Sequence, residues 1–243
     1  METITSRIYK PAEFSAGQVH EMLVTLGRKG FSPEMAAEVA NTKSGKAEQI
    51  VGIFPPVVID PVVIDSMVFF QKFYHDFCGL EVDFSGARVP EPERDFTRVL
   101  GIPQGLTPNQ MLGALEKHFP CWRYIDDLDA ATQGLNEREP VQNYFIRVRN
   151  RREADEEHKN KSANQIRAEG LTTETLLERL VHEGVYFYET GQHPDIDNIT
   201  LCTGSRDQDG DVPCAGWRRG KFGVDWYDPG GSGGGLRSRQ AVS

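Results

Sequence analysis

The stretch that decides the fold is residues 214–235, which reads CAGWRRGKFGVDWYDPGGSGGG. Near its middle every second residue is large and apolar: Phe222, Val224 and Trp226. Successive side chains of a strand point to opposite faces, so these residues are predicted to lie on a core face. The residues between them then share a free face: Gly223, Asp225 and Tyr227.

Short strand patterns continue on both sides of this segment. Residues 199–205, 212–217 and 236–242 are predicted strands, separated by loops rich in glycine and aspartate. Further upstream, strands are expected at 80–84, 96–102 and 144–149. Mixed helices and strands followed by a run of strands indicate an α+β fold rather than a parallel α/β sheet.

Helices are marked by capping residues. A capping residue precedes a proline at Ser32-Pro33 and at Thr107-Pro108, which predicts that a helix begins at each place. Ser162 with Gln165 resembles a capping box, and residues 173–189 are amphipathic and are followed by Gly191. The helix that begins at Thr107-Pro108 is expected to run until Pro120 stops it. A helix capped by Ser15, with Val19, Met22, Leu23 and Leu26 on one face, is expected before Ser32. Residues 50–64 are rich in β-branched residues and interrupted by prolines, which favours a loop. We therefore expect a helical region and linker over 1–75 and a second domain over 76–243.

The charge of the chain limits its partners. The 243 residues (27.2 kDa) include 27 Lys and Arg against 36 Asp and Glu, a formal charge of −9. Such a chain is repelled by nucleic acid and by anionic membranes, so neither is an expected partner. One basic cluster is a local exception to this negative charge, and it consists of Arg147, Arg149, Arg151 and Arg152. Acidic residues follow it directly, so it is interpreted as a solvated mixed-charge segment. The N-terminus lacks a signal-peptide pattern, which by default predicts a cytoplasmic protein, with surface display as an alternative.

No metal or cofactor site is predicted. The loop Asp207-Gln-Asp209-Gly-Asp211 lacks the glycine at position six and the glutamate at position twelve of an EF-hand and is interpreted as a turn. The four cysteines have no metal-ligand spacing and are expected to be reduced thiols. Phosphate-binding and hydrolase motifs are absent from the sequence.

The composition of residues 214–235 is unusual. Eight of these 22 residues are glycine, and glutamate, glutamine and methionine do not occur. Asparagine codons randomised at their two adenines reach glycine, aspartate, serine, arginine, tyrosine and cysteine, but not lysine, glutamate, glutamine, methionine or tryptophan. The genetic code thus supplies a mechanism for this composition, whereas a glycine-rich surface loop arising by drift is the plainer alternative.

The end of the chain resembles the variable proteins of diversity-generating retroelements. The similarity is carried by Thr200-Leu-Cys-Thr-Gly-Ser-Arg, Asp209-Gly-Asp-Val-Pro, Trp217, Val224-x-Trp226, Pro229 and Leu236-Arg-Ser-Arg-x-Ala-Val. It extends upstream through Phe119-Pro-x-Trp-Arg-Tyr to about residue 80. In that family a reverse transcriptase rewrites the 3′ end of the gene at adenines, and the encoded domain has a C-type lectin-like fold related to formylglycine-generating enzymes.

The resemblance implies a non-catalytic protein that binds an unidentified protein or other macromolecule. It implies a variable region of about 206–240 on a fixed scaffold that includes Trp217, Val224, Trp226, Pro229, Leu236, Arg237 and Arg239. The positions implied to vary and to face the ligand are Asp207, Cys214, Gly216, Arg218, Arg219, Gly223, Asp225, Tyr227, Asp228, Gly230, Ser232, Gly233, Gly235 and Gln240. Lys221 and Gln240 depart from the adenine rule.

Two other functions stay open at this level. An oxidase of the formylglycine-generating type would need a reactive cysteine pair, for which Cys202 and Cys214 are the late candidates. A structural or adaptor protein would dock a partner through the N-terminal helices. Loss of association on removal of residues 1–50 would favour the adaptor.

Overall fold

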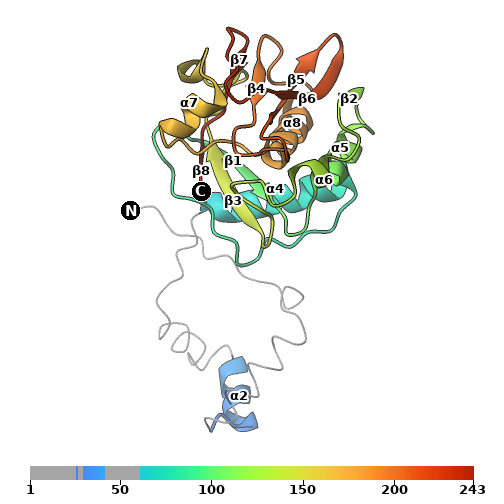
Figure 1. Cartoon of the computed structure of the whole chain (residues 1–243). Helices are drawn as coiled ribbons and strands as arrows, with labels where there is room; N and C mark the ends of the chain where they lie inside the picture. The colour runs from blue at the N-terminus through green and yellow to red at the C-terminus, as the bar shows by residue number, and fades with distance from the viewer. Residues whose placement is uncertain (1–25, 27–29, 42–60) are drawn as a thin grey trace. The chain divides into compact units, whose positions relative to one another are not determined.

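The computed structural model describes residues 26, 30–41 and 61–243 (Figure 1). The chain divides into two units, Met1–Val58 and Ile59–Ser243. In the described part of the first unit, α2 (Pro33–Ala40) begins as predicted. The Ser32 side chain accepts a hydrogen bond from the Met35 N–H, and none of the helix residues is buried. The helix expected from Ser15 lies outside the described residues, apart from Leu26.

The second unit contains two sheets and several helices. Its helices are α4 (Pro61–Phe73), which continues into the π-helical turn η2 (Tyr74–Cys78), α5 (Pro108–Leu115), α6 (Leu128–Thr132), η3 (Glu156–His158), α7 (Ala163–Ala168) and α8 (Leu176–Thr190). Its strands are β1 (Arg98–Ile102), β2 (Cys121–Arg123), β3 (Tyr144–Val148), β4 (Ile199–Leu201), β5 (Val212–Arg218), β6 (Lys221–Tyr227), β7 (Leu236–Arg237) and β8 (Ala241–Val242). This confirms the α+β class.

The strands form one sheet of order β1-β3-β8 and another of order β2-β6-β5-β4-β7. In the larger sheet β5 pairs antiparallel with β6 and with β4, whereas the short outer strands β2 and β7 run parallel to their neighbours. The edge strand β2 therefore comes from a segment far upstream of the hairpin that it extends.

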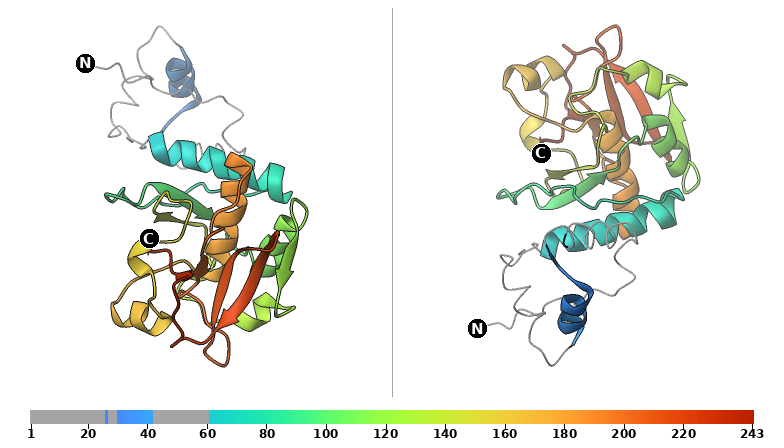
Figure 2. Two further views of the ribbon diagram at one scale, coloured as in Figure 1. Left: turned by 90° about the horizontal axis from the view of Figure 1, so that it is seen from above. Right: turned by 90° about the horizontal axis from the view of Figure 1, so that it is seen from below.

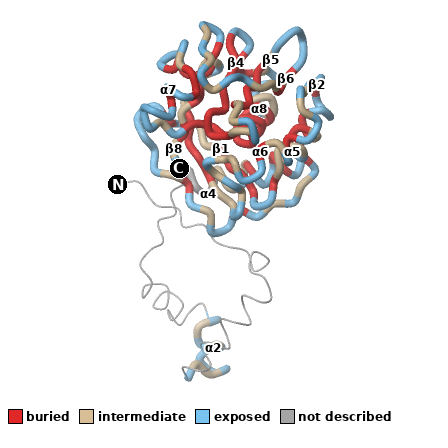
Figure 3. The backbone as a smooth tube through the Cα atoms, viewed as in Figure 1, coloured by how far each residue is buried: buried red, intermediate tan, exposed pale blue. Residues whose placement is uncertain are grey.

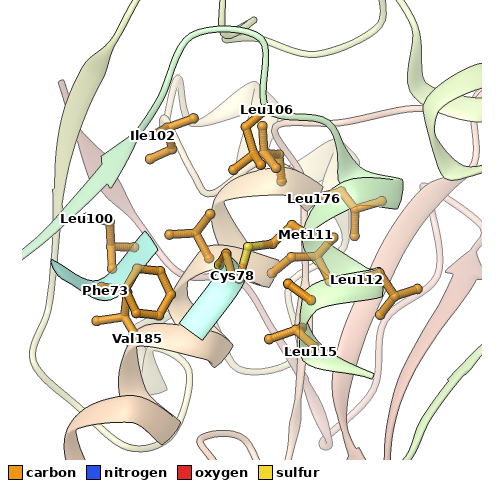
Figure 4. Close-up of a cluster of buried hydrophobic side chains, with 14 of the residues drawn as sticks. Phe73, Cys78, Leu100, Ile102, Leu106, Met111, Leu112, Leu115, Leu176 and Val185 are labelled. Carbon is orange, nitrogen blue, oxygen red and sulfur yellow. The ribbon is translucent and has the colours of Figure 1, made fainter. Parts of the chain in front are cut away.

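Helix α8 is the centre of the second unit. A capping box at Thr175 and Glu178 begins it, and Gly191 with φ 66° ends it. Every residue from Leu176 to Val185 is buried, and the helix packs against α5, β1 and β5. Figure 4 shows part of the apolar core around it, with side chains from η2, β1, α5 and α8. Helix α8 also crosses α4 in both views of Figure 2. The Tyr188 ring of α8 packs edge to face against Phe69 and Phe73 of α4.

The structure corrects the end of the expected loop over 50–64 and moves the domain boundary, while residues 50–60 lie outside the described residues. Residues 61–64 begin α4, because Pro61 suits the first position of a helix and the following turns bury Phe70 and Phe73. Burial of this aromatic face outweighs the strand preference of Val62, Val63 and Ile64. The division after Val58 thus assigns α4 to the second unit, whereas the sequence placed the boundary at 75.

Three other local predictions need correction. Residues 80–84 alternate in burial as expected, but no strand pairs with them, and Phe84 inserts into the aromatic core instead. The segment 236–242 forms two strands in different sheets, β7 and β8, rather than one. Helix α5 ends at Leu115, four residues before the expected limit, where the chain tightens into turns.

Across the described residues, no helix combines the length and the apolar character that a membrane crossing requires. Figure 3 shows the buried backbone concentrated in α8, β4 and β5 and exposed loops around them.

Candidate functional site

The hairpin of β5 and β6 carries half of the predicted ligand-facing positions. Its register pairs Cys214 with Asp225, Gly216 with Gly223, and Arg218 with Lys221. The turn between the strands consists of Arg219 and Gly220, with φ values of 50° and 76°. Positive φ at both central residues is the conformation of a type I′ hairpin turn.

The two faces of this hairpin differ as the alternation predicted, except that Trp226, expected on the core face, is only partly buried and lies outside both apolar clusters. Ala215, Phe222 and Val224 belong to the main apolar core on the inner face. On the outer face, Cys214 belongs to a second, smaller apolar cluster with Ala163 of α7, Ile199, Leu201, Val212 and Leu236. Helix α7 therefore covers one end of the outer face.

The other end of the outer face is hollow. This hollow, which we call the hairpin hollow, has a volume of about 820 Å³. It is lined by Trp122, Ile196, Ile199, Cys214, Gly216, Trp217, Arg218, Arg219, Lys221, Gly223 and Asp225. Six of the predicted ligand-facing residues thus meet at one site: Cys214, Gly216, Arg218, Arg219, Gly223 and Asp225.

Trp122, Ile196 and Ile199 are the part of the hollow that the sequence did not indicate. Trp122 is opposite Gly223 in the parallel register of β2 and β6, and its side chain is 46% exposed. Ile196 lies in the loop before β4. No local signal reveals either residue, because a parallel partner strand leaves no mark at short sequence separation.

The remaining predicted positions lie elsewhere. Tyr227 is paired with Val212 at the opposite end of the hairpin from the turn. Asp228 accepts a hydrogen bond from the Gly230 N–H at 2.8 Å, within the glycine-rich loop that also carries Ser232, Gly233 and Gly235. These residues form an adjoining surface and do not line the hairpin hollow.

Asp207 and Gln240 have structural contacts of their own. The Asp207 carboxylate accepts hydrogen bonds from the N–H groups of Asp209 and Asp211 and so holds the predicted turn. The Gln240 side-chain oxygen accepts a hydrogen bond from Arg149 at 3.1 Å, and the backbone N–H of Gln240 donates one to Asp155 at 2.8 Å. Neither residue lines the hairpin hollow, which is the physical reason to remove them from the candidate site.

The rim of the hairpin hollow is cationic. Arg218, Arg219 and Lys221 are exposed, and no ion pair joins them to a carboxylate among the residues that the structure describes. Asp225 faces them from β6 and accepts a hydrogen bond from its neighbour's N–H, that of Trp226. This rim contrasts with the formal charge of −9 on the chain.

The arginine cluster before η3 is not a comparable surface, and the sequence interpretation of it as solvated is wrong for two of its members. Arg147 is buried and donates to the Pro90 carbonyl at 2.6 Å. Arg149 pairs with the buried Asp155 at 2.5 Å, and Arg151 pairs with Glu157. Internal carboxylates and carbonyls therefore engage most of this cluster.

The cysteines show no activated thiol. Burial raises the pKa of Cys214 to about 12 and raises that of Cys202 well above its ordinary value. The two belong to different apolar clusters, Cys202 to the main core and Cys214 to the outer cluster. A nucleophilic cysteine needs a lowered pKa and access to substrate, so this arrangement does not suit oxidase chemistry.

A buried ionic cluster lies beneath the hollow. Asp195 receives Arg179 Nε at 3.0 Å, Arg239 Nη2 at 2.7 Å and the Thr200 hydroxyl at 2.5 Å. Its backbone carbonyl accepts the Trp217 N–H at 3.0 Å. Asp195 thereby joins α8, the segment between β7 and β8 that carries Arg239, and the floor of the hollow.

Aromatic stacking fixes Trp217 as well. The ring of His193 stacks on Trp217 with centroids 3.6 Å apart and on Phe187 at 5.0 Å. His193 Nδ1 lies 2.8 Å from Glu183 Oε1, and Glu183 also receives Arg179 at 2.9 Å. The floor of the hollow is therefore preorganised by buried contacts that do not involve its open face.

Space on the outer face differs between its two paired glycines. A Cβ at Gly216 would be 3.2 Å from Ile199 Cγ1 and 3.3 Å from the Asn198 carbonyl, whereas a Cβ at Gly223 would make an ordinary 3.4 Å contact with Trp122. The outer face therefore has room for a larger side chain at position 223 and not at position 216.

We expect Gly216→Val to lower the free energy of unfolding by about 1–3 kcal/mol, the usual range for overpacking. Gly223→Val is expected to change it by less than about 0.5 kcal/mol, as at an open strand position. Urea unfolding of the two variants beside the parent protein measures the difference. Equal midpoints for both variants would contradict this account of the hollow.

The turn offers a second prediction. Arg219 adopts the left-handed conformation, which is unfavourable for a side chain of its kind and suits asparagine before glycine. Arg219→Asn is expected to raise the free energy of unfolding by about 0.5–1 kcal/mol. Arg218→Asn, at the extended end of β5, serves as the control and should give no gain. A stabilisation shared by both variants would indicate a charge effect instead.

A second hollow, of about 590 Å³, lies beside β3 and contains none of the predicted positions. Arg138, which lines it, is already paired with Glu178 at 2.6 Å and donates to the Thr173 carbonyl at 2.5 Å. This cation is engaged internally, which leaves the hairpin hollow as the better candidate for a ligand.

The comparisons with known proteins are negative. Neither the protein-family models, nor the curated proteins, nor the solved structures that were searched include a match to this chain.

Proposed function

We propose that this protein is a non-catalytic binding protein whose ligand surface is the outer face of the β5–β6 hairpin. The observation that carries the proposal is the convergence of Cys214, Gly216, Arg218, Arg219, Gly223 and Asp225 on the hairpin hollow. The resemblance to variable proteins implies these positions from the sequence, without reference to their spatial arrangement. The ligand is a protein or another macromolecule.

We further propose that the surface is diversified by a retroelement on a C-type lectin-like scaffold. Support comes from the separation of the two hairpin faces. Phe222 and Val224 are fully buried in the main core, while Gly223 and Asp225 between them are not. Such a hairpin can change its outer residues with little effect on the core that holds it.

Deep sequencing of the 3′ end of the gene and its flanks, from a population of source cells, tests this proposal. We expect variation at codons 218, 219, 223 and 225, only where a nearby template copy carries adenine. The codons of Ala215, Phe222 and Val224 serve as internal controls and should be constant. An invariant region without a template would overturn the diversification.

A catalytic alternative is disfavoured by the burial of Cys202 and Cys214, which raises the pKa of both thiols. Its direct test is oxidation of a cysteine-containing peptide in the presence of copper. Turnover that is lost in Cys202→Ser would replace the proposed binding function with an oxidase.

A further inference from the structure

We propose that the hairpin hollow recognises an acidic peptide segment of a partner protein, with an apolar side chain seated against Trp122 and carboxylates at the cationic rim. This inference rests on the proposed binding function and specifies the chemistry of its ligand. It adds residues outside the diversified region, Trp122 and Ile196, as constant parts of the site.

Trp122 forms an apolar wall of the hollow. Its ring carbon Cε3 would lie only 3.4 Å from a Cβ at position 223, so the ring lies against the backbone of β6 where that residue lacks a side chain. Almost half of the side chain stays exposed. An aromatic ring held flat on a rigid strand offers a large contact area at a small cost in side-chain entropy.

Ile196 supplies a second apolar contact, on a loop that is held in place. The Glu153 carboxylate accepts hydrogen bonds from the backbone N–H groups of Ile196, Asp197 and Asn198 at 3.2–3.3 Å, and from the Asn198 side chain at 2.6 Å. Ile196 is exposed although its backbone is fixed. Preorganised apolar groups of this kind lower the entropic cost of binding.

The charge of the rim determines the partner chemistry. Arg218, Arg219 and Lys221 converge from one turn, and Asp225 is the acidic residue that lines the same hollow. Two uncompensated positive charges remain within a strongly acidic chain, so an acidic ligand is favoured and a basic one is repelled. Arginine and tryptophan are also the residues that most often dominate binding energies.

A peptide fits this surface better than a nucleic acid. A nucleic acid places a phosphate at every nucleotide, and a chain with a formal charge of −9 repels the phosphates that lie beyond the rim. A short peptide needs only one or two carboxylates beside an apolar residue. The hollow, about 820 Å³, accommodates a few residues of such a segment.

The test is panning of a random twelve-residue peptide library displayed on phage against the full chain. We expect enrichment of sequences in which Asp or Glu flanks Leu or an aromatic residue. A synthetic fluorescent peptide of the enriched sequence then gives the dissociation constant by anisotropy. Enrichment of neutral or basic peptides, no enrichment at all, or stronger binding of a single-stranded oligonucleotide would each overturn the inference.

Matched variants assign the binding to the hollow. Trp122→Ala is expected to weaken the peptide at least tenfold, whereas Tyr124→Ala, at a 70% exposed aromatic next along the chain, should not. Arg218→Glu is likewise expected to weaken it at least tenfold, with Arg94→Glu at an exposed arginine outside the hollow as control. Equal losses in a variant and its control would contradict the site.

Two further measurements separate the possible failures. Circular dichroism melts confirm that each variant is folded, and Trp122→Phe should retain most of the affinity if Trp122→Ala proves unstable. If codons 218–225 are constant but the acidic peptide binds, only the proposed diversification is wrong. If these codons vary but neutral peptides are enriched, the acidic ligand is wrong and the proposed function stands.

Discussion

Replacing Asp195 with asparagine is expected to lower the free energy of unfolding by about 3–5 kcal/mol, the usual cost of removing one partner from a buried ion pair. Asp195 is fully buried between Arg179 and Arg239. Burial by itself raises the pKa of this carboxyl, but the two guanidinium groups outweigh that effect and hold the pKa at about 2. The carboxylate is therefore charged at all physiological pH values.

Asparagine isolates the loss of charge. Asp195 has φ 52°, and asparagine tolerates this left-handed conformation, so the backbone is not strained by the change. Its amide, however, would point N–H groups at arginine donors, leave Arg239 without a carboxylate partner and leave Arg179 with Glu183 alone. Asp197→Asn, two residues on and exposed, is the control and should cost less than about 0.5 kcal/mol.

Urea unfolding followed by tryptophan fluorescence measures both variants. The change in fluorescence should also report on the hollow, because the Asp195 carbonyl accepts a hydrogen bond from the backbone N–H of Trp217. If Asp195→Asn is as stable as the parent protein, the ionic cluster does not hold the hairpin, and the stacked pair of His193 and Trp217 must do so unaided.

The second large effect concerns Glu174 and depends on pH. Burial raises the pKa of Glu174 to about 7, in spite of the opposing influence of Arg239 and Arg179. Its Oε1 lies 2.7 Å from His182 Nδ1, and burial together with the same arginines lowers the pKa of His182 well below its ordinary value. Below pH 7 the folded protein thus holds a neutral carboxylic acid against a neutral imidazole.

The sign of the pH effect follows from the unfolded chain, where Glu174 titrates near its ordinary pKa of 4.5. Between pH 4.5 and 7 the folded state binds a proton that the unfolded state has released. The contribution of this group to stability is therefore present at low pH and is lost as the pH rises through 7. From pH 5 to pH 8 the loss amounts to about 2–3 kcal/mol.

Glu174→Gln keeps a neutral hydrogen-bond donor for His182 and removes the titration. The stability of the variant relative to the parent protein is expected to rise by about 2–3 kcal/mol between pH 5 and pH 8, measured by urea unfolding at each pH. Glu91→Gln, at an exposed position, is the control for the loss of a carboxyl group. A flat difference for Glu174→Gln would mean that this carboxyl titrates normally when folded.

The features that the sequence predicted best are local ones. The strand alternation of β6 and the caps at Ser32, Thr107 and Ser162 depend on residues within a few positions of one another, and the structure contains them all. The aspartate turn at Asp207 belongs to the same class.

The features that the sequence did not predict depend on long-range packing. The apolar stripe of α8 was recognised, but its other faces are buried too. Arg179 pairs with Glu183 of the same helix and with Asp195 of a later loop, and His182 contacts Glu174. Charged residues of a helix usually face solvent, so their burial is not predicted by the helix pattern. The wall formed by Trp122 was missed for the same reason, since its strand has no partner within 90 residues of sequence.

That parallel pairing has a consequence for biosynthesis. Cys121 pairs with Phe222, so about 100 residues must leave the ribosome after β2 before its partner strand exists, which takes about 5–20 s at ordinary synthesis rates. For part of that interval α8 has been made but β5, which packs against it, has not. The five-stranded sheet is therefore assembled late, and chains truncated before Val212 should expose the side of α8 that β5 covers and be prone to aggregation and to capture by chaperones.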